Sequence, residues 1–355
     1  MSATEIPVTQ ICIALVLLAA GTFLLLRHIG LALVVIVLPL LGAMVAGFAA
    51  SWLHLSGFVP GTALALAPGY LIACILAWHI ASRIAAGEPR NALARAAATD
   101  IALPLAGALM LVLGVHALDR NASSLGVAAA GAVLSLLAAP LAMSRLPFGE
   151  DFVARFNRVA ERRRRRLLWL DPIVQSRWAW SIAGISVVLT ALGYFGIHHW
   201  PHVALVWLVP AMLAIVVGLA AIRDWRFAIA AAFSLFPLTV LSLWAAGSIP
   251  PFQPLGLGAL AIHAVAARAA AFVRQGDDVG TASLRVIEQL GAPIIYALLV
   301  CAVVLQVFAT QQAAGDFFVL VLAGVAALTL PIAFAVVIEG LFPRHATIEA
   351  RHRVG

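Results

Sequence analysis

The chain alternates long apolar runs with short connections that carry most of its charged residues. Each run covers about 16 to 26 residues, which is enough for an α-helix to cross roughly 30 Å of hydrocarbon. Apolar residues are continuous within the runs, whereas the strands of a membrane β-barrel alternate, so the pattern predicts helices. The predicted helices cover residues 11–26, 29–54, 60–83, 100–118, 124–146, 178–197, 201–222, 227–247, 254–274, 291–310 and 316–340.

The order of these runs is written twice, about 190 residues apart. Arg27 stands before a run that contains Pro39, and Arg223 stands before a run that contains Pro237. Further landmarks recur in the same order, as the pairs Trp52 and Trp244, His79 and His263, Gly87 and Gly276, and Pro140 and Pro331. This repetition predicts two five-helix repeats with the helix 178–197 between them. Duplicated bundles of this kind place a pathway at their interface.

Composition assigns the chain to the membrane proteins. Hydrophobic residues make up 64% of the chain, charged residues make up 10%, and the mean hydropathy is +1.06. Soluble domains are far more polar, so we expect an all-α integral membrane protein. The first apolar run has the length of a secretory signal, but Glu5 is the only charged side chain before it. A signal peptide has a basic leading segment, so we predict a retained helix.

The basic residues predict the orientation. All 22 of them are arginine, and with eleven crossings and an outside N-terminus only Arg120 faces outside. Basic residues stay on the cytoplasmic side during insertion, so we expect a bacterial inner-membrane protein with a periplasmic N-terminus and a cytoplasmic C-terminus. A repeat of five crossings would leave the second copy inverted, and the extra helix between the repeats returns it to the orientation of the first. This predicts parallel repeats related by a pseudo-two-fold axis along the membrane normal.

The predicted organisation has five parts. They are a first transmembrane repeat (1–146), an Arg-rich cytoplasmic linker (147–177), a linking helix with a short periplasmic turn (178–200), a second transmembrane repeat (201–340) and a cytoplasmic tail (341–355).

Helix order and connector style resemble a known transporter family. In each repeat a helix ends in a connector that contains a glycine and small residues, in 82–93 and in 272–279, and the last helix carries a proline. The chain resembles the membrane domain of the RND superfamily, and most of all its MMPL branch of lipid and hydrophobe exporters. The resemblance implies a membrane component of an export system for lipids or hydrophobic metabolites.

Departures from the family suggest that the chain works with partners. The family's first helix is absent, and the large outside domain of the second half is reduced to residues 198–202. We therefore expect other envelope or periplasmic subunits, or a second copy of the chain, in addition to membrane lipids. The alternative is a non-transporting subunit that scaffolds a membrane complex.

The family drives transport through a carboxylate in a Gly-x-x-Asp-Tyr type motif. In the first repeat Gly69 stands where the aspartate is expected, followed by Tyr70, and in the second repeat Leu260 takes that place. None of the 15 acidic residues lies deep in a predicted helix. An ionisable group in hydrocarbon needs a partner or water, so a carboxylate-driven proton pump is disfavoured in this chain alone.

Histidine is the remaining candidate for proton or ligand chemistry. His263 lies midway along its predicted helix and His79 lies nearer the end of the matching helix. Each is either a titratable group in a polar path, because imidazole ionises near neutral pH, or a neutral side chain bonded to a backbone carbonyl. Tyr70 either bonds across the bundle or packs. The transport-path candidates are Gly69, Tyr70, His79, Leu260 and His263.

Other chemistry has little support in the sequence. His198, His199 and His202 have helical metal-ligand spacing, but Pro201 interrupts that helix, so a solvated turn is favoured over zinc. The three cysteines lie in apolar runs, where they act as small apolar side chains. A membrane-embedded enzyme is the least favoured class because no nucleophile, base and orienting group converge. We therefore predict no catalytic residue, cofactor or metal.

The linker holds the strongest charge run. Phe148, Phe152, Phe156 and Val159 recur at helical spacing ahead of five arginines, which are Arg162, Arg163, Arg164, Arg165 and Arg166. An amphipathic helix against anionic headgroups explains both features. The adjoining apolar residues favour this interpretation over nucleic-acid binding. Elsewhere, the glycines of 42–47 and 126–131 allow helices to approach closely.

Overall fold

The computed structural model describes residues 8–52, 66–102, 105–106, 109, 122–167, 176–196, 222–244, 252–308 and 313–343. Within these ranges every regular element is a helix. Four stretches are long and apolar enough to cross a membrane, namely Ala67–Ala85, Gly256–Arg274, Val279–Val304 and Val319–Leu341, and several shorter helices are also apolar. This all-helical, apolar architecture is consistent with a helical membrane protein.

The elements follow one another as long helices broken by short ones. The N-terminal group comprises α1 (Val8–Leu26), α2 (Ile29–Trp52), α4 (Ala67–Ala85), α5 (Arg90–Ala97), the π-helical segment η1 (Ala98–Ala102) and α7 (Ala122–Ser144). Then come α8 (Glu150–Leu167) and α10 (Ser176–Gly196). The C-terminal group comprises α12 (Trp225–Trp244), α13 (Phe252–Arg274), α14 (Val279–Val286), the π-helical segment η3 (Ile287–Gly291), α15 (Ala292–Phe308) and α16 (Ala313–Leu341).

Most predicted helices lie within a few residues of the observed ones, with two exceptions. The helix predicted to begin at residue 100 is preceded by α5, which begins at Arg90, and the helix predicted at 291 is preceded by α14 from Val279. Both short helices are amphipathic: α5 exposes Arg90 and Arg95, α14 exposes Arg285, and each buries small or apolar residues on its other side. The prediction ended each apolar run where charged residues begin, so it assigned these two amphipathic helices to loops. The predicted helix 201–222 falls almost entirely outside the described residues.

The two groups pack internally in the same order. In the N-terminal group α2, α4 and α7 contact one another, and in the C-terminal group α12, α13 and α16 do the same. Each group also folds its short helix back onto its central helix, α5 onto α4 and α14 onto α13. The last helices, α7 and α16, each contain a proline, Pro140 and Pro331.

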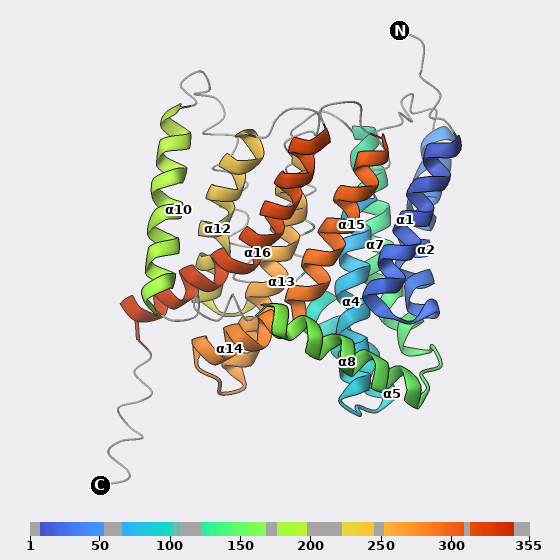
Figure 1. Ribbon diagram of the computed structural model, residues 1–355, viewed down its shortest axis with the longest axis horizontal. Helices are drawn as coiled ribbons and strands as arrows, with labels where there is room; N and C mark the ends of the chain where they lie inside the picture. The colour runs from blue at the N-terminus through green and yellow to red at the C-terminus, as the bar shows by residue number, and fades with distance from the viewer. Residues whose placement is uncertain are drawn as a thin grey trace.

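The groups meet along their central helices. α4 contacts both α13 and α15, α1 lies against α15, and α4 and α13 also contact η3 and η1 of the opposite group. Figure 1 shows the long helices side by side, with α10 at one edge and α1 and α2 at the other. Almost all of α4 and α13 is buried, because neighbouring helices surround them on every side. The two helices are therefore the centre of the molecule.

Matching turns end these central helices. Gly87 and Gly276 both have positive φ, 80° and 110°. After α4 the Gly87 amide donates to the Ile84 carbonyl and the next amide donates to Arg83, and the turn at Gly276 repeats this pattern. This is the Schellman arrangement, in which glycine avoids the steric cost of the left-handed region. Figure 1 shows that α5 and α14 consequently lie at the same end of the bundle.

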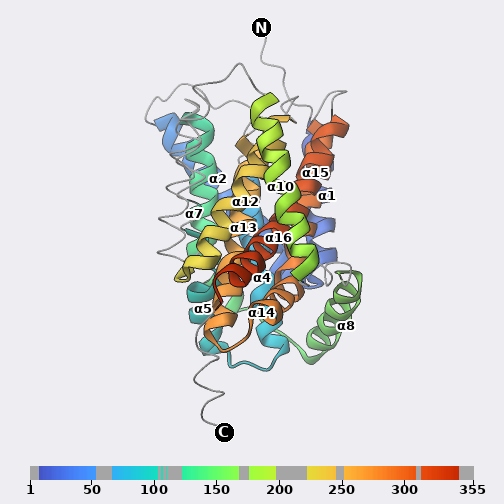
Figure 2. The same cartoon turned by 90° about the vertical axis from the view of Figure 1, so that its left-hand side faces the viewer.

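The predicted amphipathic helix is present as α8, and it lies across that same end (Figures 1 and 2). Phe152 and Phe156 are buried, and the Phe156 ring lies 4.7 Å from the Trp78 ring of α4. His28 lies against Phe152 and bonds to the carbonyl of Pro147. The apolar face of α8 thus packs against the protein itself, and contact of its arginines with a bilayer surface stays a prediction.

Small residues allow α2 and α7 to approach closely, as the sequence predicted. A Cβ atom added at Gly42 would lie 2.6 Å from the Cα of Gly131. We predict that Gly42→Ala lowers the free energy of unfolding by about 1–3 kcal/mol, because the backbone of α7 must shift. Thermal unfolding of the purified protein measures this. Gly184→Ala is the matched control, since nothing lies within 4 Å of a Cβ there; an equal loss in both variants would contradict the prediction.

The N-cap of α14 gives a pH-dependent prediction. The hydroxyl and the amide of Thr281 both donate to the Asp278 carboxylate, and these bonds lower the pKa of Asp278. A lowered pKa means that the stabilisation is present above the unfolded value, about 3.9, and is lost as pH falls through the folded value. Asp278→Ala should therefore cost about 1 kcal/mol at neutral pH, and the difference from wild type should shrink in acid.

Unfolding curves recorded from neutral pH downward test this prediction. Asp278→Asn serves as the control, because asparagine caps a helix without titrating in this range. A loss in Asp278→Ala that stays constant at every pH would show that the carboxylate does not act as a titrating cap.

Candidate functional site

A network of charged side chains joins the two groups near the turn end of the central helices. Arg268 of α13 is its most buried cation, with a side chain only 5% exposed. Its Nε donates to Oε1 of Gln289 in η3 at 2.9 Å, and its Nη1 donates to Oδ2 of Asp100 in η1 at 3.0 Å. The guanidinium also lies 4.4 Å from the centre of the Phe272 ring, which is a cation–π distance.

Arg83 completes the network from α4. Its Nε donates to Nε2 of His79 at 3.0 Å, its Nη1 to Glu88 at 2.6 Å and its Nη2 to Oδ2 of Asp100 at 2.6 Å. All three nitrogens of this guanidinium therefore have partners. Charge-assisted bonds of these lengths are about twice as strong as neutral ones.

The Asp100 carboxylate is shared between the two groups. One oxygen, Oδ2, accepts from Arg83 of the N-terminal group and from Arg268 of the C-terminal group. Its side chain is 25% exposed, so the pairs lie between an apolar interior and the surface. Two arginines and the carboxylates of Asp100 and Glu88 leave the network with no formal net charge, which reduces the cost of burying it.

The hydrogen bond from Arg83 determines the protonation state and the tautomer of His79. An Nε–H donor points at Nε2, so that nitrogen must accept, and the imidazole is neutral with its proton on Nδ1. His79 also lies 4.0 Å from Oδ2 of Asp100. Because Nε2 carries no proton in this arrangement, the contact is a near approach and not an ion pair.

The structure brings only one predicted path residue into the network. That residue is His79. The hydroxyl of Tyr70 instead lies 2.9 Å from the hydroxyl of Thr22 in α1. Of the two alternatives for Tyr70, this contact is the hydrogen bond across the bundle. Gly69 lies against α7, where an added Cβ would be 2.8 Å from the carbonyl carbon of Gly131. A close helix contact explains this glycine.

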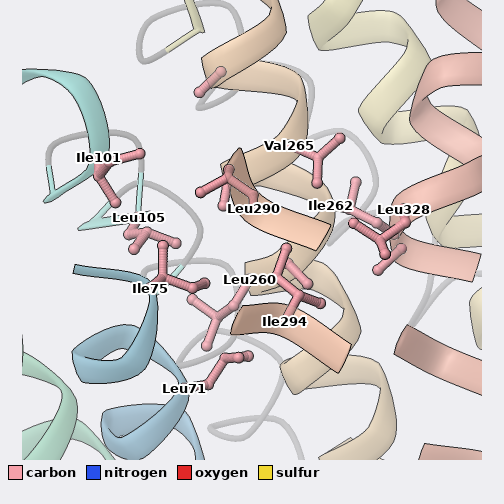
Figure 3. Packing of buried hydrophobic residues seen from close by; sticks show 14 of the residues in the cluster. Leu71, Ile75, Ile101, Leu105, Leu260, Ile262, Val265, Leu290, Ile294 and Leu328 are labelled. Carbon is pink, nitrogen blue, oxygen red and sulfur yellow. The ribbon is translucent and has the colours of Figure 1, made fainter. Parts of the chain in front are cut away.

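The second-group candidates are enclosed by apolar residues. Leu260 is fully buried in α13, and Figure 3 shows it among the side chains of Leu71, Ile75 and Ile294. His263 is 1% exposed, and its Nδ1 lies 2.8 Å from the Ala259 carbonyl of its own helix. This is the backbone bond of the second alternative considered for histidine. The role of these residues in transport stays a prediction.

Counting from the turn glycines pairs the residues differently from the order of landmarks in the sequence. His79 stands eight residues before Gly87, and eight residues before Gly276 stands Arg268, whereas His263 stands five residues further back. Counted from its turn glycine, Arg268 therefore stands at the position that His79 takes in the first group. By the same count from the turns, Asp100 matches Gln289.

The predicted lipid-contact arginines lie on α8. The side chains of Arg162 and Arg165 are exposed, and Arg165 pairs with Glu161 one turn earlier. The side chains of Arg163, Arg164 and Arg166 are outside the described part of the structure, as are the histidines at 198, 199 and 202. Contact with anionic headgroups stays a prediction.

Sequence reasoning missed most of the network. It searched for acids deep in apolar runs, and Asp100 stands at the edge of one. The signal that could have found the site is Arg268, a cation inside an otherwise apolar helix, because such a residue needs a partner. Its partner Asp100 is 168 positions away, which no local pattern reveals.

The network can hold charge and join two elements of the structure. All three nitrogens of Arg83 and two of Arg268 already have partners. In the described part of the chain no three histidine, cysteine or acidic side chains group as metal ligands. The arrangement is that of an electrostatic clamp. Comparison with known proteins adds no assignment, since neither a family model nor a curated protein matches the chain.

The buried arginine should be important for stability. We predict that Arg268→Leu lowers the free energy of unfolding by about 2 kcal/mol, because a hydrogen bond to a charged group is worth about 1.5–3 kcal/mol. The loss stays in this range because Asp100 still pairs with Arg83 in the variant. Arg285→Leu is the control, since Arg285 pairs with Asp277 at the same end of the bundle but is 52% exposed. An exposed pair is worth less than about 1 kcal/mol. An equal loss of unfolding free energy in the two variants would contradict the prediction.

Proposed function

We propose that the chain is the membrane component of an export system for lipids or hydrophobic metabolites, working with partner chains. In this proposal the N-terminal and C-terminal groups are parallel repeats of one helical unit and belong to an RND-like, MMPL-like architecture of about eleven crossings. The protein lies in a bacterial inner membrane with its N-terminus in the periplasm and its C-terminus in the cytoplasm.

The observation that carries the proposal is the recurrence of backbone features at matching places. Arg27 and Arg223 both have positive φ, 54° and 56°, directly before α2 and α12. Both central helices end in the same glycine turn, and each turn leads to an eight-residue helix and a five-residue π-helical segment. Positive φ is rare outside glycine, so agreement at the two arginines supports duplication better than apolar composition does.

The position of the central pair supports transport. Repeats that move relative to each other alternate access to a site at their interface, and α4 and α13 lie at the interface of the two groups, together with α1 and α15. The placement of the Gly87 and Gly276 turns at one end of the bundle supports parallel repeats. Exposed apolar residues on α1, α2 and α10, such as Val16, Phe48 and Val188, are suited to contact with lipid.

One observation favours the alternative, a scaffolding subunit of a membrane complex. The contact between α4 and α13 is filled by Leu71, Ile75 and Leu260, with Leu290 and Ile294 beside them (Figure 3). A closely packed apolar seam is what a static joint requires. A transporter would have to open this seam during its cycle.

Deletion of the gene separates these functions. We expect an exporter's lipid or hydrophobic substrate to accumulate in the inner membrane, and wild-type protein to restore export. His263→Ala should restore it less well if the histidine lies on the path, and Gly184→Ala in α10 should restore it fully. Lipid mass spectrometry of separated membranes measures the substrate, and immunoblots confirm equal protein levels.

The scaffold makes a different prediction in the same experiment. Partner chains would fall in abundance on deletion, lipids would stay in place, and both variants would restore the partners equally. That result would overturn the export proposal.

A further inference from the structure

We propose that Asp100 is the centre of an ionic latch that closes the seam between α4 and α13 at the turn end of the bundle. The latch consists of Asp100, Arg83 and Arg268, with Glu88, His79 and Gln289 as supporting partners. Its role rests on the proposed function, because a latch controls transport only in a protein that transports. Its existence depends on the contacts alone.

The first reason is that the two bonds to Asp100 come from opposite sides of the seam. Arg83 belongs to α4 and Arg268 to α13, and both donate to the same oxygen. Separating the two helices at this end would leave at least one guanidinium without its carboxylate. A buried charge that loses its partner is strongly destabilising, so the groups stay together while Asp100 keeps its charge.

The second reason is the contrast between this end and the rest of the seam. Away from the network the contact between α4 and α13 is apolar, as Leu71 and Leu260 show (Figure 3). Apolar contacts have no preferred direction, so the apolar part of the seam does not by itself select one register. Charge-assisted bonds are directional, and the bonds to Asp100 fix the register of one helix against the other at the turn end.

The third reason is the support around the network. Gln289 orients Arg268 from η3, and His79 and Glu88 orient Arg83 from two sides. Since Arg268 keeps Gln289, and Arg83 keeps His79, Glu88 and Asp100 within its own group, opening needs only the bond between Arg268 and Asp100 to break. Helix α8 contacts both α4 and η3. It therefore bridges the two groups at the same end of the bundle as the network.

Hydrogen–deuterium exchange of the full-length protein in lipid nanodiscs tests the latch. Asp100→Asn should increase exchange roughly tenfold or more in both η1 and η3, because local opening becomes easier on both sides of the seam. Asp277→Asn is the matched control. It removes a carboxylate that pairs with Arg285 at the same end of the bundle but within one group, so faster exchange should be confined to the region of α14.

Exchanging the charges at positions 100 and 268 distinguishes loss of the latch from general misfolding of a variant. Asp100→Arg alone should increase exchange in both segments, and adding Arg268→Asp should restore protection, since Asp at 268 can then accept from Arg83 and from the new arginine. Failure of the double variant to regain protection, or an effect of Asp100→Asn confined to η1, would overturn the latch.

Transport is measured separately on the same variants. Faster exchange on both sides of the seam with no exported substrate in any strain would support the latch and reject the exporter. Substrate export by wild type with unchanged exchange in Asp100→Asn would reject the latch and leave the exporter in place.

Discussion

One oxygen atom of Asp100 connects the two helical groups of this protein. A guanidinium inside an apolar bundle is costly unless an anion accompanies it, and Arg268 is such a group. The only way to satisfy it with Asp100 is to bring η1 of the first group against α13 of the second. The glycine turns, the short amphipathic helices and the π-helical segments are the backbone features that make this approach possible.

The sequence predicted the helices well where apolar runs are long and end sharply. The observed bounds of α1, α2 and α13 agree with the predicted ones within three residues, because hydrophobic length and charged ends determine them. It failed at α5 and α14, where one face is apolar and the other carries charge. A pattern search for continuous apolar runs cannot recognise an eight-residue helix of this kind.

The candidate site was predicted only in part. His79 was selected because of its place near a helix end, and it does take part in the network. Its proposed counterpart His263 bonds to its own helix instead, and the carboxylate of the network, Asp100, lies at a helix end, where the sequence placed it. Long-range pairing between residues of opposite groups follows from packing, which one sequence read alone does not contain.

The asymmetry of the network has a consequence for how such a molecule can be assembled. His79 and Arg268 stand equally far before their turn glycines, and Asp100 and Gln289 equally far after them, yet in each pair only one member carries a permanent charge. Two identical copies of the first group would offer a carboxylate to a neutral imidazole, and two copies of the second would offer a carboxamide to a guanidinium. Neither homodimer reproduces the contact between aspartate and arginine, so a chain severed between the groups should reassemble selectively from unlike fragments.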